Sequence, residues 1–213
     1  AGHLCRRNGE LQLAAAAYQR AIDLDGSRHE ALLAMARVLH ALGQSQLWLD
    51  AFGHALEAAR EQGAAQNKPL LVVQSAHRMG QYVMEQGDAP GAEGVLRMAL
   101  AECRNEVAEL TAEIHIDLAE ALLRQGRTNE ALAPLTAASS STQEPTLVRL
   151  AMLSFRHNLW PEALKVLRRN LALHPDSANA LWNLAHLLAE CWQMDEAETL
   201  LQKAEALAPM HGA

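Results

Sequence analysis

Apolar residues recur at helical spacing along the chain, and the pattern is clearest in residues 176–209. Two apolar stripes in this stretch follow the i, i+3, i+4, i+7 spacing of amphipathic helices. The first stripe consists of Leu181, Leu184, Ala185 and Leu188, and the second of Ala197, Leu200, Leu201 and Ala204. The pattern predicts two helices joined by a short turn.

The same pattern occurs one unit earlier, at a shift of 34 residues. Matching residues are Glu162 and Glu196, Ala163 and Ala197, Leu167 and Leu201, Leu173 and Leu207, and the prolines Pro175 and Pro209. One helical hairpin cannot bury its apolar face alone, so such units stack on one another. Small residues are expected where helices touch most closely, because large side chains there would push the helices apart.

These residues resemble the tetratricopeptide repeat, whose signature is W-x2-L-G-x2-Y, then A-x3-F, then P. The stretch supplies Leu181-x2-Leu184-Ala185-x2-Leu188, then Ala197-x3-Leu201, then Pro209. The resemblance implies an all-α fold, a right-handed α-solenoid of about six helical hairpins within one domain, 1–213. The expected units are approximately 1–26, 27–62, 67–104, 105–140, 144–175 and 176–209.

The register of the repeat predicts eleven full helices and one partial helix. Turns are expected near Gly9, Gly43, Gly87, Gly126, Asn158 and Trp192. The spacing from Gly43 to Gly87 is about ten residues longer than the repeat, so we expect the helix after Gly43 to extend to about residue 62 and the next to open at Pro69. The register also places the first residues inside a helix, so we expect the chain to be part of a longer protein.

Composition and charge narrow the class of protein. Half of the residues are hydrophobic but only 4% are aromatic, which favours helices over strands. The formal net charge of −7 argues against bulk nucleic-acid binding. The apolar runs are too short for a membrane span, and no signal peptide is recognisable at the start. The three cysteines are odd in number and far apart, which is typical of reduced thiols, so we expect a cytoplasmic protein, with a processed periplasmic chain as the alternative.

The sequence shows no catalytic motif. The ten histidines have no metal-ligand spacing on a common helix, and no CxxC, HExxH, GxSxG or glycine-rich phosphate loop is present. We therefore expect partly exposed helix histidines, no catalysis, no metal and no cofactor.

The resemblance implies a concave groove lined by the first helix of each hairpin. The side chains that the register points into this groove are Arg6, Arg37, His40, His77, Gln81, Glu120, Arg124, Met152, Phe155, Arg156, Asn179, Trp182 and His186. The predicted groove is basic at its amino-terminal end and apolar at its carboxy-terminal end, and exposed apolar clusters mark partner sites. The alternative is that Phe155 and Trp182 belong to the core between repeats.

One further position of the repeat carries Arg78, Asp117, Arg149 and Asn183 in successive units. We interpret it as an internal ladder that rigidifies the stack rather than as a ligand site. The carboxylate clamp of chaperone-binding relatives needs Lys and Asn at fixed positions of consecutive units, and these are missing here, so that class of partner is rejected.

The favoured hypothesis is a non-enzymatic scaffold that binds a peptide or helical segment of a protein partner in the groove. The alternative is the repeat region of a larger enzyme, such as a protein glycosyltransferase or sulfotransferase, whose catalytic domain lies outside this chain. Only Asn183 fits the asparagine ladder of such glycosyltransferases. The last helix carries Leu200 and Leu207, for which this chain offers no further unit as a cover. We expect residues beyond 213 of a longer native chain to cover this surface; the alternatives are a second copy of the chain, by self-association through uncapped ends, or a crystal neighbour.

Overall fold

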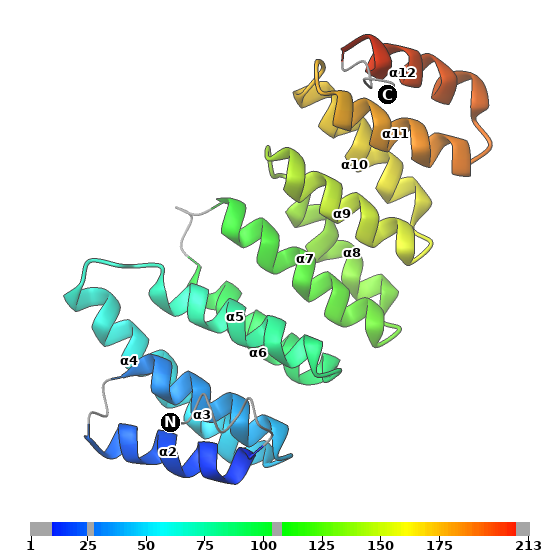
Figure 1. Ribbon diagram of the computed structural model, residues 1–213. Coiled ribbons are helices and arrows are strands. Elements are labelled where there is room, and N and C mark those ends of the chain that lie inside the picture. The colour runs from blue at the N-terminus through cyan, green and yellow to red at the C-terminus, as the bar shows by residue number, and fades with distance from the viewer. Residues whose placement is uncertain (1–9, 25–27, 104–107, 208–213) are drawn as a thin grey trace. The chain divides into compact units, whose positions relative to one another are not determined.

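The computed structural model describes residues 10–24, 28–103 and 108–207. These residues form eleven α-helices joined by turns and contain no strand, which confirms the all-α prediction (Figure 1). They divide into two compact units, Ala1–Arg104 and Asn105–Ala213.

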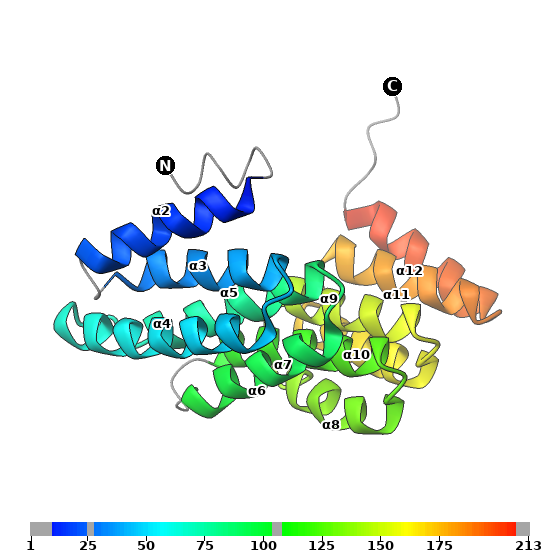
Figure 2. The same ribbon diagram turned by 90° about the horizontal axis from the view of Figure 1, so that it is seen from below.

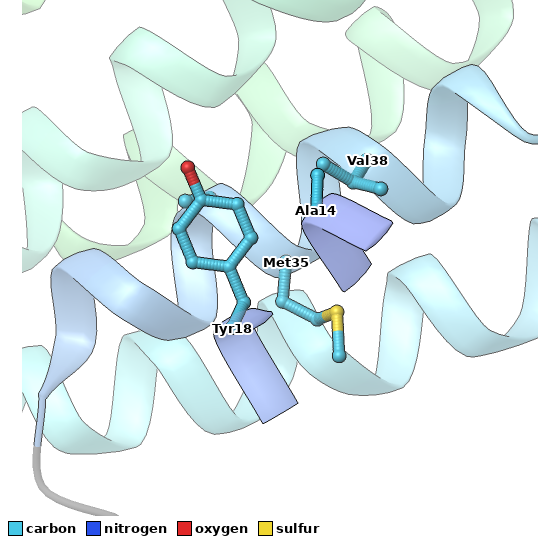
Figure 3. Packing of buried hydrophobic residues seen from close by; sticks show 5 residues of the cluster. Ala14, Tyr18, Met35 and Val38 are labelled. Carbon is cyan, nitrogen blue, oxygen red and sulfur yellow. The ribbon is translucent and has the colours of Figure 1, made fainter. Parts of the chain in front are cut away.

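The first unit contains α2 to α6. Their bounds are Leu11–Leu24 for α2, His29–Ala41 for α3, Ser45–Ala65 for α4, Leu71–Glu85 for α5 and Ala89–Glu102 for α6. Helices α3 and α4 form one hairpin and α5 and α6 the next, while α2 packs on α3. Figure 3 shows the contact of α2 with α3, in which Ala14 and Tyr18 face Met35 and Val38.

The second unit contains α7 to α12 in three consecutive hairpins. Their bounds are Ala108–Arg124 for α7, Thr128–Ala138 for α8, Glu144–Arg156 for α9, Trp160–Leu173 for α10, Ala178–Glu190 for α11 and Met194–Leu207 for α12. Within this unit α9 contacts both α7 and α11, and α10 also packs on α11. We call the first helix of each hairpin (α3, α5, α7, α9, α11) its A helix and the second its B helix; Figure 2 gives a second view of these pairs.

Every A helix ends in the same backbone motif. The residue after the helix cap takes a left-handed conformation, with φ of +71° at Gly43, +85° at Gly87, +75° at Gly126, +60° at Asn158 and +61° at Trp192. The next amide then donates a hydrogen bond to the carbonyl five residues back, as from Gln193 to Leu188 at 2.9 Å. Five predicted turns are thereby confirmed; the sixth, at Gly9, lies outside the described residues.

Small residues lie where each A helix meets its own B helix. The equivalent positions are Ala36, Gly80, Ala119, Ala151 and Ala185, and all five are buried. The close approach is measurable at Gly80, where a Cβ atom would lie 2.6 Å from Leu96 Cδ2 on α6. The register inferred from the sequence therefore places these residues correctly.

Helix α4 corrects two of the predicted boundaries. It runs to Ala65 rather than to about residue 62, and α5 begins at Leu71 rather than at Pro69. The reason is a further left-handed turn, with φ of +53° at Asn67 and a 2.7 Å hydrogen bond from the Lys68 amide to the Gly63 carbonyl. The turn requires glycine at position 63, because a Cβ atom on Gly63 would lie only 2.8 Å from the Lys68 carbonyl oxygen.

Asn170 on α10 is fully buried, and neither atom of its amide group has a hydrogen-bond partner among the described residues. Neighbouring B helices carry a fully buried alanine at the equivalent position: Ala55, Ala99, Ala138 and Ala204. A buried polar group without a partner costs about 1–3 kcal/mol. Asn170 therefore destabilises this hairpin relative to an alanine at the same position.

Replacing Asn170 with alanine should raise the free energy of unfolding by about 1–2 kcal/mol, because the unpaired amide is removed from the core. Urea denaturation followed by circular dichroism would show the change as a higher midpoint. An unchanged or lower midpoint would mean that the amide is satisfied, for instance by a buried water molecule.

The outer surface of α12 is less apolar than the sequence predicts. Leu200 is buried within the chain against its neighbours, whereas Leu207 is 50% exposed and Leu201 is half-buried. Among the described residues of α12, Leu207, Met194 and part of Leu201 remain exposed. Self-association through this surface stays a prediction.

Candidate functional site

Two exposed apolar side chains lie on neighbouring A helices of the second unit. Met152 on α9 is 50% exposed and Trp182 on α11 is 39% exposed, whereas the leucines of both helices are buried. Helices α9 and α11 contact each other. The A-helix face of the second unit is the name we give to Met152 and Trp182 together with the exposed polar residues Arg124, Arg156, Asn179 and His186.

Polar and charged residues surround this apolar pair. Arg156, in the last turn of α9, is exposed, as are Asn179 and His186 on α11. On α7, the Arg124 guanidinium donates a 2.6 Å hydrogen bond to the carboxylate of Glu120, which lies one helical turn earlier. The two side chains also form an ion pair. Most of the predicted groove residues of this unit are thus exposed to solvent, and their common face stays a prediction.

Phe155 is less exposed than Met152 and Trp182, the other large apolar residues of the predicted groove. It is half-buried, and its ring packs edge-on against Trp160 of α10 with 4.7 Å between the centroids. Phe155 therefore contributes to the packing of the α9–α10 hairpin and offers only part of its surface to a partner. The sequence interpretation of Phe155 as core is closer to the structure than its interpretation as an anchor.

In the first unit, Arg37 and His40 are occupied by contacts between hairpins. The Arg37 guanidinium lies 5.4 Å from the centroid of the Tyr82 ring, and the Tyr82 hydroxyl donates a 2.9 Å hydrogen bond to the Arg37 carbonyl. His40 packs edge-on against Trp48 and Tyr82, and its Nε2 lies 3.1 Å from the Asp88 carboxylate. Both residues hold the α3–α4 hairpin to the α5–α6 hairpin.

His77 is likewise buried rather than directed to solvent. Its Nε2 lies 3.2 Å from the Gln81 amide nitrogen, one turn further along α5. Arg6 lies outside the described residues. The predicted basic end of the groove is therefore wrong for His40 and His77, because ring packing and hydrogen bonds with neighbouring residues enclose them.

Arg149 on α9 forms the strongest polar link between hairpins of the second unit. Its guanidinium pairs with both Asp117 and Glu113 of α7. Although burial lowers the pKa of Arg149, the two carboxylates raise it above its ordinary value. Asp117 is buried, and removing one partner of a buried ion pair is destabilising.

Other links recur at nearly the same sequence separation, about one repeat. Ser141 donates a hydrogen bond of 2.6 Å to Glu109, and Ser177 donates one of 2.8 Å to Glu144. Thr146 donates one of 2.9 Å to Glu113. The sequence analysis missed these links, although the repeat of Glu and Ser at a fixed interval is visible in hindsight.

The predicted ladder extends less far than its four positions suggest. Asp117 and Arg149 pair with each other, whereas Arg78 of the first unit is exposed and Asn183 of α11 is half-buried. The further contacts are made by the side chains of Glu113 and Thr146 rather than by those of Arg78 and Asn183. The link is therefore a local cluster on α7 and α9.

The histidines and cysteines of the described residues do not gather into a metal-binding group of three or more ligands with Asp or Glu. His115 on α7 is partly buried, and burial lowers its pKa. No helix in the described part of the chain has the length and apolar character needed to cross a bilayer.

Comparisons with known proteins agree with this geometry. Three family models described as tetratricopeptide repeat match residues 1–28, 77–145 and 156–213, which together make up most of the chain. A search of curated proteins finds no match.

Solved structures with this fold include BtubC from P. vanneervenii, with a TM-score of 0.55, 16% identity, and 98% of this chain and 93% of that one covered. PilW, described as a widely conserved type IV pilus biogenesis factor, has a TM-score of 0.54 at 14% identity, with coverage of 96% and 89%. PilF from Pseudomonas aeruginosa has a TM-score of 0.50 at 16% identity, with coverage of 98% and 89%. Stacked hairpins with the same turn at the end of each A helix, together with the three family matches, show that this chain belongs to the tetratricopeptide-repeat family.

Proposed function

We propose that this chain is a protein-interaction scaffold without catalysis of its own, and that the A-helix face of its second unit binds a peptide or helical segment of a partner protein. The observation that carries the proposal is the exposed pair of Met152 and Trp182 on adjacent A helices. Large apolar side chains that remain exposed beside a fully packed core are typical of interaction surfaces.

The charge around the pair adds to the proposal. Arg156 is exposed beside Met152 on the same helix, and His186 and Asn179 lie one turn either side of Trp182. A partner segment with an apolar residue for the Met152–Trp182 surface and a carboxylate for Arg156 would satisfy both features. The apolar contact would set the lifetime of the complex, and the charge would assist association.

The family supplies the wider context. Tetratricopeptide repeats are helical scaffolds, and PilW, which shares the fold, is described as a type IV pilus biogenesis factor. The first unit is a poorer candidate, because His40, His77 and Arg37 are engaged in packing between or within its hairpins. The proposal therefore places the site on α7, α9 and α11.

Replacing Trp182 with alanine should weaken partner binding at least ~10-fold without unfolding the chain, since a central aromatic anchor is lost. The partner would first be captured from native lysate and identified, and its affinity then measured by calorimetry. Arg156→Glu should mainly slow association and reduce its dependence on salt.

Leu173→Ala is the matched control, because Leu173 is also exposed but lies on the B helix α10. It should leave the affinity unchanged. Binding that survives Trp182→Ala and Arg156→Glu but is lost in Leu173→Ala would place the site on the B helices and contradict the proposal.

A further inference from the structure

The turn between α11 and α12 contains an unusual residue. Trp192 has a φ of +61° and its side chain is 86% exposed. The equivalent turns carry Gly43, Gly87, Gly126 and Asn158, which are the residue types that tolerate this conformation. A bulky side chain there is strained, and an indole this exposed gains little packing in return.

Trp192 is therefore not needed for the stability of the turn. Its backbone bonds are those of the other turns, with the Trp192 amide 3.0 Å from the Ala189 carbonyl and the Gln193 amide 2.9 Å from that of Leu188. Glycine would make the same bonds without strain. A conformationally costly aromatic residue held out into solvent is instead suited to binding.

The surroundings of Trp192 indicate the chemistry of what it binds. Met194 follows it and is 55% exposed, so the turn presents two adjoining apolar side chains. Glu190, the last residue of α11, and Asp195, in the first turn of α12, are exposed and have no ion-pair partner among the described residues. The apolar tip is thus flanked by carboxylates on both sides.

We propose that the turn formed by Glu190 to Asp195 is a second docking point, which takes a lysine- or arginine-bearing, partly apolar segment of a partner protein. The cation stacks on the face of the Trp192 indole, the aromatic ring that attracts cations most strongly. Glu190 and Asp195 pair with the same or a neighbouring cation, and Met194 covers its aliphatic stem.

Charge complementarity favours a basic protein segment over a lipid surface. Tryptophan is common at membrane interfaces, but membranes that attract proteins electrostatically are anionic, and two free carboxylates beside the indole would be repelled by them. The site is also separate from the Met152–Trp182 pair, because Trp192 belongs to the turns at the ends of the hairpins, where Figure 1 shows the α9–α10 and α11–α12 connections.

The test uses the full chain and two fluorescein-labelled helical peptides, one of leucine and lysine and one with glutamate in place of every lysine. Binding is followed by fluorescence anisotropy. The wild type should bind the leucine–lysine peptide more tightly than its glutamate counterpart. Trp192→Gly should weaken leucine–lysine binding at least ~10-fold. Glu190→Gln with Asp195→Asn should weaken it and reduce its salt dependence.

Two controls make the result specific. Trp182→Ala should leave leucine–lysine binding unchanged, so a failure of this proposal is distinguishable from a failure of the A-helix-face proposal. Trp192→Gly should also melt about 2–4 °C higher than the wild type, because the strain at this turn is relieved.

Several results would overturn the proposal. These are equal binding of the leucine–lysine peptide by wild type and Trp192→Gly, equal affinity for the two peptides, or a lower melting temperature for Trp192→Gly. Binding to vesicles of phosphatidylcholine, with or without phosphatidylserine, that depends on Trp192 while peptide binding does not, would make the turn a membrane contact instead.

Discussion

Replacing Ala185 with leucine is expected to lower the free energy of unfolding by about 1–3 kcal/mol. Ala185 is fully buried on α11, at the position equivalent to Gly80 of α5, where the chain carries only small residues. Three further carbons cannot enter this contact unless α11 and α12 move apart. Urea denaturation followed by circular dichroism measures the loss.

Ala119→Leu should have a similar effect in the α7–α8 hairpin, because Ala119 is also fully buried at the equivalent position. The matched control is Ala206→Leu, since Ala206 is exposed on α12 and should change stability by less than about 0.5 kcal/mol. Midpoints that do not change in either buried variant would show that the contact between A and B helices lies elsewhere.

Replacing Arg149 with methionine is expected to destabilise the second unit by about 1–3 kcal/mol. The change keeps most of the aliphatic stem but removes the guanidinium that pairs with the buried carboxylate of Asp117 and the half-buried one of Glu113. Removing one partner of a fully buried ion pair costs more than this. The expected loss is smaller here because Arg149 is partly exposed and water screens the pair. Thermal and urea denaturation at neutral pH both report the effect.

Arg168→Met provides the control for Arg149→Met. Arg168 pairs with Glu196 at 3.2 Å between α10 and α12, and both side chains are exposed. Exposed pairs of this kind contribute about 0–1 kcal/mol. If Arg149→Met were no more destabilising than Arg168→Met, the cluster on α7 and α9 would be only a surface contact.

The turns show why much of this fold is predictable from the sequence. A left-handed residue is needed after every A helix, so Gly43, Gly87 and Gly126 are recognisable without any structure. The spacing of small residues then fixes which faces of the helices meet. The end of α4 was predicted less accurately, because Asn67 makes a turn that the repeat pattern does not contain.

The side chains of the candidate site were harder to predict. Repeat register states which face of a helix a residue occupies, but not whether a neighbouring hairpin covers it. Arg37 illustrates this point, because the same register position is exposed at Met152 and His186, whereas Arg37 is half-buried and its guanidinium lies over the Tyr82 ring. The exposure of a side chain depends on the size of residues on the next helices, which a single repeat does not reveal.

Several polar links in the second unit join one hairpin to the next, as Arg149 joins α9 to α7 and Ser177 donates a hydrogen bond to Glu144. The chain segments closed by these contacts are therefore only about one repeat long, and closing short segments costs little entropy. Structure can then nucleate in any hairpin of the unit and propagate to its neighbours, so this unit should fold rapidly for its length.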